Sequence, residues 1–181
     1  MSTDRPGDID PHLESHQQAP SETPLIDFPD EELDELIWTR LLGARRDWIE
    51  QTDSAPWTEP WFSQHSPLVR AYLATRDFEN EVSNGGLYQY FYNNEERPWL
   101  FQLVIDGYGL LGLDDLRQKL LKQVLPIARS VNERELRALD RRTRQPKVAV
   151  QSKLNALDSV VSDNTAVRIK LIRRNPQTFG L

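Results

Sequence analysis

The feature that most constrains the fold is a double glycine between an acidic segment and a run of aromatic residues. The stretch reads Glu79-Asn80-Glu81-Val82-Ser83-Asn84-Gly85-Gly86-Leu87-Tyr88-Gln89-Tyr90-Phe91-Tyr92-Asn93. Glycine adopts the left-handed conformation without steric cost and commonly follows a helix end. Gly85-Gly86 is therefore predicted to end one helix, and residues 87–93 are predicted to form a short helix after the break.

Apolar residues recur at helical spacing along most of the chain, and no segment alternates like a strand. Asp30 and Ser66-Pro67 are typical helix starts. Gly107 and Gly109 should weaken one helix end, and Pro126 should kink or end another helix early. The predicted fold class is all-α, a compact bundle-like domain of several helices. Helices are expected at residues 30–50, 66–84, 87–93, 98–111, 113–128, 147–161 and 163–174. A further helix is expected to start at a capping box formed by Asn132 and Glu135.

The domain organisation follows from composition. Residues 1–28 contain four prolines and few apolar residues, which predicts a disordered tail. Residues 29–181 are predicted to form a single domain, in which residues 52–65 are a loop held on the core by Trp57, Trp61 and Phe62. Cysteine is absent, which excludes disulfides and thiolate metal sites. Without a signal peptide or a spanning helix, the expectation is a cytoplasmic protein with no cofactor and no metal.

The segment from Glu81 to Asn93 resembles a known bacterial signature, Asn-Gly-Gly-(Leu or Phe)-x-Gln-(Tyr or Phe)-Phe-x-Asn. The signature belongs to a domain of unknown function that includes the DNA-mimic proteins described from Neisseria. Residues 154–158 and 172–179 look like the C-terminal pattern of that family, so the resemblance covers about residues 66–180. It implies an all-helical fold and supplies no catalytic residues to carry over. In the DNA-mimic member, an acidic surface occupies the DNA-binding face of a transcription factor and so relieves repression.

Charge is distributed unevenly along the chain. Residues 1–115 hold 23 acidic and 7 basic side chains, a net charge of -16, whereas residues 116–181 hold 5 acidic and 15 basic side chains, a net charge of +10. This asymmetry predicts either a bipolar surface or internal pairing of the two parts. Six carboxylates lie within residues 27–35. A helix rises about 1.5 Å per residue, so such a cluster can approach the charge density of duplex DNA, about one charge per 1.7 Å.

These carboxylates are either a solvated helix start or part of a partner-binding surface. The predicted partner-binding residues are Asp30, Glu31, Glu32, Asp34, Glu35, Glu95 and Glu96.

The glycine motif also has two interpretations. Its polar side chains could converge on a ligand, or the turn could serve only to pack two helices. The motif residues concerned are Glu81, Asn84, Gly85, Gly86, Gln89, Tyr90, Phe91 and Asn93.

A set of arginines defines a further candidate surface. Arg134, Arg137, Arg141 and Arg144 lie at spacings of three and four, hence on one helix face, where they could bind nucleic acid or an acidic partner. Alternatively, the face is solvated or paired with acidic neighbours along the same helix.

We therefore expect a protein-binding module and not an enzyme. The first hypothesis is a DNA mimic that engages a basic DNA-binding protein or transcription factor. The alternatives are a nucleic-acid-binding regulator that acts through the basic C-terminal third, and a toxin-immunity protein. The sequence leaves the oligomeric state open.

Overall fold

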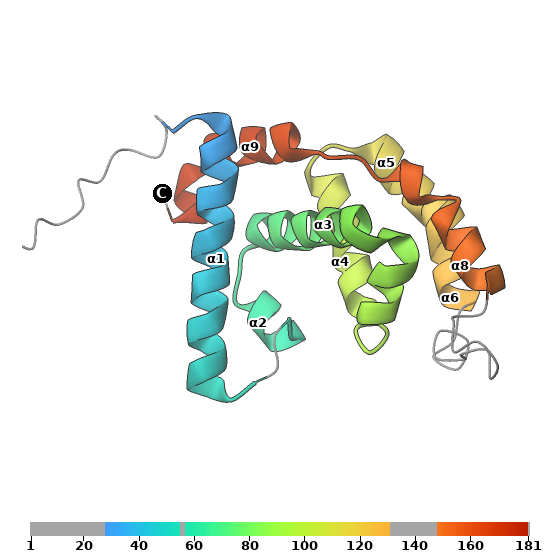
Figure 1. Cartoon of the computed structure of the whole chain (residues 1–181). Coiled ribbons are helices and arrows are strands. Elements are labelled where there is room, and N and C mark those ends of the chain that lie inside the picture. Colours follow the sequence, from blue (N-terminus) through green and yellow to red (C-terminus); the bar gives the residue numbers. More distant parts are fainter. Residues whose placement is uncertain (1–27, 55–56, 131–147, 181) are drawn as a thin grey trace, which may run out of the picture.

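The computed structural model describes residues 28–54, 57–130 and 148–180, and all regular secondary structure within them is helical. The predicted all-α class is therefore confirmed. The predicted tail and the capping box at Asn132 and Glu135 lie outside the described residues. The elements (Figure 1) are α1 (Asp30–Thr52), α2 (Glu59–Ser63), α3 (Pro67–Asn93), α4 (Pro98–Leu110), α5 (Asp114–Lys119), η2 (Leu120–Val124), α6 (Leu125–Ser130), α8 (Val148–Asn155), η3 (Asp158–Val160), α9 (Thr165–Arg174) and η4 (Pro176–Phe179).

Helix α3 is the central element of the fold. It packs against α4 and α8, and α1 stands across one end of it, in contact with α9 (Figure 1). The start of α3 is the predicted one: Ser66 Oγ accepts a hydrogen bond from the Val69 N–H (3.3 Å), and Pro67 occupies the first turn. Among the described residues, no helix is both long enough and apolar enough to cross a lipid bilayer.

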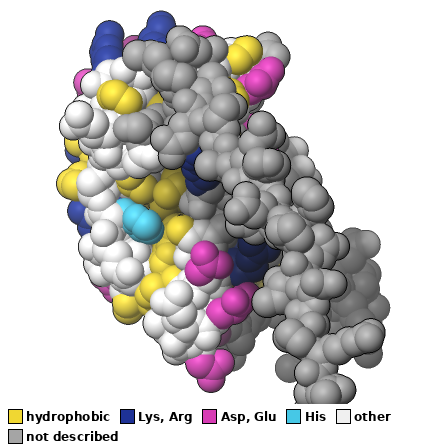
Figure 2. All heavy atoms as spheres, turned by 90° about the vertical axis from the view of Figure 1, so that its left-hand side faces the viewer, with side chains coloured by type: hydrophobic (Ala, Val, Ile, Leu, Met, Phe, Trp, Pro, Cys, Tyr) yellow, Lys and Arg dark blue, Asp and Glu magenta, His cyan; other side chains and the backbone are white. Residues whose placement is uncertain are grey.

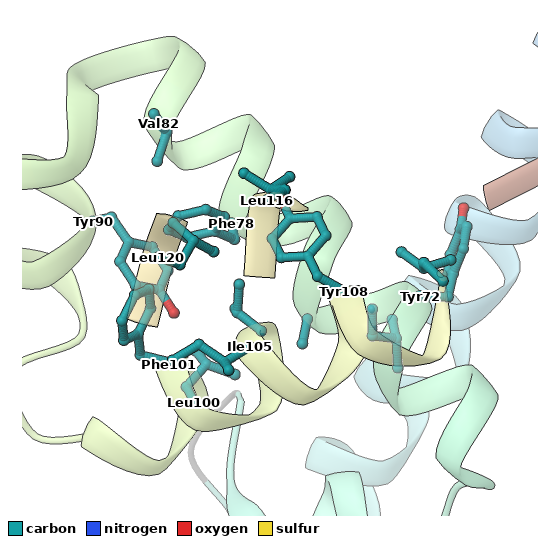
Figure 3. Packing of buried hydrophobic residues seen from close by; sticks show 14 of the residues in the cluster. Tyr72, Phe78, Val82, Tyr90, Leu100, Phe101, Ile105, Tyr108, Leu116 and Leu120 are labelled. Atoms are coloured by element: carbon teal, nitrogen blue, oxygen red, sulfur yellow. The ribbon is translucent and has the colours of Figure 1, made fainter. Parts of the chain in front are cut away.

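Aromatic side chains of α3 and α4 form the centre of the core (Figure 3). Phe78 lies between them, with its ring centroid 4.7 Å from that of Tyr90 and 5.8 Å from that of Phe101. The Phe78–Tyr90 pair is edge-to-face, an arrangement that aromatic quadrupoles favour. The two segments of α3 on either side of the glycine motif are thereby packed against each other.

Helix α4 ends at Leu110, within one residue of its predicted end, and contains Gly107 and Gly109. A Cβ at Gly107 would lie 3.2 Å from the backbone of Ala71, so glycine there lets α3 and α4 approach closely. Two other segments differ from the predictions. The predicted loop at 52–65 contains the short helix α2, whose Trp61 and Phe62 are buried as expected. The predicted helix at 147–161 ends at Asn155 and is followed by the 3-10 turn η3.

The helix that contains Pro126 is not interrupted, contrary to the expected early end. Instead, the π-helical turn η2 precedes the proline, and the Leu125 N–H donates to the Leu120 carbonyl. A wider turn of this kind relieves the ladder of hydrogen bonds where proline supplies no N–H. The helix therefore continues as α6 to Ser130.

Asp30 and Asp163, the acidic residues at the starts of the first and last predicted helices, lie beside the cap position. Asp30 is the first residue of α1, and the cap position is occupied by Pro29. Asp163 precedes Asn164, the residue at the cap of α9, but its carboxylate accepts a hydrogen bond from the Thr165 N–H at 2.8 Å. Asp163 therefore still satisfies one backbone donor of the first turn.

Candidate functional site

The double glycine produces its break at a single residue. Gly86 has φ 77° and ψ 174°, whereas Gly85 shows no positive φ. The Leu87 N–H, released by the break, donates to Asp158 Oδ1 at 2.8 Å. A Cβ at Gly86 would lie 2.6 Å from Asp158 Oδ2. Glycine is thus needed both for the backbone conformation and for the approach of Asp158, which supports the packing interpretation of the motif.

The remaining motif residues divide between the core and the surface. Tyr90 is buried, and Phe91 packs against Phe101 with ring centroids 4.9 Å apart. Asn93 Nδ2 donates to a Glu81 carboxylate oxygen at 2.7 Å. Gln89 and Asn93 line a surface hollow of about 340 Å³, whereas the exposed Asn84 does not line it. The polar side chains of the motif therefore do not all converge on one point.

A buried polar cluster centred on Glu79 joins three helices. Glu79 is 5% exposed and accepts hydrogen bonds from Tyr108 Oη (2.8 Å), from Asn164 N (3.1 Å) and from Arg168 Nη1. The cluster connects α3 to α4 and α9. Burial, and then the neighbouring Glu79 carboxylate, raise the pKa of Tyr108. The sequence analysis did not predict this cluster. The one indication in the sequence is Glu79, an acidic residue on the buried face of a long helix.

The start of α1 is tied to the interior and to the C-terminal helix. Asp34 is 4% exposed, and its Oδ2 lies 2.8 Å from Arg76 Nε, with Arg168 Nε 3.8 Å from its Oδ1. Asp30 pairs with Arg173 at 2.6 Å. The prediction that Asp34 lies on a partner-binding surface is therefore wrong, because its carboxylate is the counter-ion of buried arginines. The contacts of Arg168 with Asp34 and of Arg173 with Asp30 join the basic part of the chain to the acidic part.

The other predicted acidic residues of α1 are closer to solvent. Glu35 is two-thirds exposed and pairs with Arg76 at 2.8 Å. Glu32 is exposed, and the side chain of Glu31 lies outside the described residues. The start of α1 thus offers fewer carboxylates to a partner than the sequence indicates.

Glu95 and Glu96 lie in a cleft of about 610 Å³ between the start of α2 and the loop that joins α3 to α4. We call it the acidic cleft. Three glutamates, three aromatic residues and one arginine are among the side chains that line it. The described residues that line it are Trp57, Thr58, Glu59, Tyr92, Asn93, Glu95, Glu96, Arg97 and Trp99.

Next to the acidic cleft lies a partly buried group of charges. Asn93 both lines the cleft and binds Glu81, and its carbonyl accepts a hydrogen bond from Arg97 Nη2 at 3.0 Å. Burial, together with the nearby Glu81 carboxylate, raises the pKa of Asp77 to about 6, against the opposing effect of Arg45 and Arg97. At Asp77, burial and the Glu81 carboxylate therefore outweigh the two arginines.

On the face shown in Figure 2, the acidic side chains of the described residues form small groups, several of them near the lower edge. Basic and hydrophobic side chains lie between these groups. The end of α1 and the start of α2 carry four exposed carboxylates, those of Asp47, Glu50, Asp53 and Glu59. They extend the acidic character beyond the cleft.

The predicted arginine face and the metal question remain. Arg134, Arg137, Arg141 and Arg144 lie outside the described residues. Within the ranges that are described, no group of three or more histidine, aspartate or glutamate side chains could hold a metal ion.

Comparison with known proteins identifies the family. The model of a family described as "DMP19-like protein" matches residues 63–174, more than half of the 181 residues. No curated protein and no solved structure shows significant similarity to the chain. The matched segment contains the glycine motif, the Glu79 cluster and much of the acidic cleft, and it agrees with the resemblance to DNA-mimic proteins that the motif indicated. The chain therefore belongs to the DMP19-like protein family.

Proposed function

We propose that the protein is a cytoplasmic DNA mimic that binds a basic DNA-binding protein and catalyses no reaction. The observation that carries the proposal is the family match over residues 63–174. In support of it, the described residues hold exposed carboxylates that are separate from the ion pairs joining α1 to α3 and α9. A mimic works by presenting negative charge where a DNA-binding protein expects phosphates.

The proposed contact surface is displaced from the start of α1 to its end. Asp30 and Glu35 form ion pairs within the protein, and Asp34 is buried. The exposed carboxylates of Glu50, Asp53 and Glu59 follow one another at the end of α1 and the start of α2. Glu95 and Glu96 line the acidic cleft that begins at Glu59. We propose that these five residues face the partner.

The test is competition with DNA. The full chain, immobilised, is used to capture proteins from the cytosol of the source cell at low salt, and retained proteins are identified. A retained DNA-binding protein should be displaced by duplex DNA, because the mimic and DNA compete for one surface. Its affinity should also fall steeply between about 50 and 200 mM salt, since charge dominates such contacts.

Matched variants locate the surface. Replacing Glu50, Asp53 and Glu59 by their amides should weaken binding of the identified partner. A control with the same loss of charge, in which the exposed Asp106, Asp114 and Asp115 become asparagines, should not. A partner that binds DNA and this protein at the same time would refute mimicry, as would an affinity that is unchanged by salt.

The same protein preparation distinguishes DNA mimicry from the two alternative functions. A nucleic-acid-binding regulator should shift duplex DNA in a gel by itself, whereas a mimic should not. A toxin-immunity protein would retain a nuclease and inhibit it, so the identity of the captured protein distinguishes it. Among the described residues, no observation favours either of them over the mimic.

A further inference from the structure

Two buried polar atoms face each other where α1 meets α9. Asp34 Oδ1 and Arg168 Nε are both inaccessible to solvent, and neither has a hydrogen-bond partner among the described residues. The two residues are only 4% and 2% exposed. The atoms lie 3.8 Å apart, whereas an N–H···O hydrogen bond spans about 2.7–3.2 Å. The opposite charges therefore attract each other, but the hydrogen bond between them is not made.

The other polar atoms of these two side chains hold them in place. Asp34 Oδ2 lies 2.8 Å from Arg76 Nε. Arg168 Nη1 donates to Glu79, and Arg168 Nη2 donates to Thr165 Oγ1 at 2.8 Å. Because each side chain would have to give up a partner to approach the other, direct contact between Asp34 Oδ1 and Arg168 Nε is disfavoured. The two atoms nevertheless need partners, since buried polar groups are nearly always hydrogen-bonded.

The chemistry of the two atoms narrows the kind of molecule that can join them. It must accept a hydrogen bond from the Arg168 Nε–H and donate one to the Asp34 carboxylate. A cation would be repelled by Arg76 and Arg168, and an anion would be repelled by Asp34 and Glu79. A neutral molecule that both donates and accepts is required, and water is the smallest one.

A third polar atom lies close to the pair. Tyr72 is fully buried, and its Oη donates to the backbone carbonyl of Asp34 at 2.9 Å. The charges of Asp34 and Arg168 both act on this hydroxyl. Its oxygen can also accept a hydrogen bond. A buried water typically makes two to four hydrogen bonds, and these three residues offer that number.

We propose that one buried water molecule bridges Asp34 Oδ1 and Arg168 Nε and thereby joins α1 to α9. The Arg168 Nε–H donates to the water, which donates one hydrogen to Asp34 Oδ1 and the other to Tyr72 Oη. A water-mediated bond of this kind is nearly as favourable in enthalpy as a direct one. The inference does not depend on the proposed function, because it involves none of the exposed carboxylates.

A high-resolution crystal structure of the full chain tests the proposal. We expect a peak of electron density within about 2.7–3.2 Å of both atoms. In solution, we expect a nuclear Overhauser effect between the Arg168 Nε–H and water, with the sign of a water molecule that tumbles with the protein. A direct hydrogen bond between Arg168 Nε and Asp34 Oδ1 would overturn the inference. So would two separated atoms with no density between them.

A matched pair of variants tests the position of the water. In Asp34→Glu, the extra methylene lets the carboxylate reach Arg168 Nε directly, so the density peak and the Overhauser effect should both be lost. The control is Glu35→Asp, which changes the length of the neighbouring, two-thirds exposed carboxylate and should retain both signals. An unchanged Overhauser effect in Asp34→Glu would contradict the assignment. If that variant does not fold, the two measurements on the wild type still decide the question.

Discussion

Replacing Gly86 with alanine should lower the free energy of unfolding by about 3 to 5 kcal/mol. The backbone at Gly86 has φ 77° and ψ 174°, a region essentially confined to glycine, where another residue costs on the order of 1–3 kcal/mol. The added Cβ would also lie 2.6 Å from Asp158 Oδ2. The carboxylate would have to withdraw from the Leu87 N–H, and a hydrogen bond to a charged group contributes about 1.5–3 kcal/mol.

Urea unfolding of the full chain, followed by far-UV circular dichroism, measures this loss. Gly112→Ala is the control, because Gly112 also has a positive φ of 74° but a Cβ added there would meet no atom within 4 Å. Gly112→Ala should therefore lower the free energy of unfolding only through the strain of a positive φ at alanine. In a double-mutant cycle, Gly86→Ala should cost less in an Asp158→Ala background. Equal losses at the two glycines, together with no coupling to Asp158, would refute the reasoning.

Three further changes test the interior and the helix ends. Arg168→Met should destabilise the protein by about 3–5 kcal/mol, because it leaves the buried Glu79 carboxylate without its cation; urea unfolding measures the loss, and a loss below about 1 kcal/mol would contradict it. The pKa of Asp77 is raised from 3.8 to about 6 in the folded protein, so the folded state takes up a proton before the unfolded state does as the pH falls. Asp77 thus lowers stability above about pH 6, and this cost fades towards pH 4. Asp77→Asn should therefore be more stable than the wild type at neutral pH, with a gap that narrows in acid; a gap that widens in acid would argue against the assignment. Ser66→Ala should cost about 1 kcal/mol through loss of the α3 cap, measured as a lower melting temperature, and an unchanged melting temperature would show that the cap contributes little.

Local signals predicted the helix starts well and the helix ends less well. Ser66-Pro67 and Pro98 begin helices because proline and a capping hydroxyl act within one turn of chain. The need for glycine at position 107 comes from the close approach of α3, and one segment of sequence does not contain that information. The π-helical turn before Pro126 was likewise not predicted, and it contains the buried residues Leu120 and Val124.

The candidate site was predicted in part. Glu95, Glu96 and Asn93 were identified from the sequence and lie together in the acidic cleft. Asp34 was expected on the surface, although its neighbours Leu33 and Ile37 mark the buried stripe of α1. Its position beside Leu33 and three residues before Ile37 could have placed it on that stripe. Its partners Arg76 and Arg168 are far away in the sequence, and local sequence patterns do not reveal contacts between distant residues.

The ion pairs between α1 and the rest of the protein limit how the chain can be shortened. A fragment cut at the bounds of the family match, residues 63–174, would keep Arg76 and Arg168 but lose Asp34, which pairs with Arg76 and approaches Arg168. The guanidinium of Arg76 would also lose Glu35, and the apolar surface under α1 would be open to water. A fragment with these bounds should therefore be less stable than the full chain.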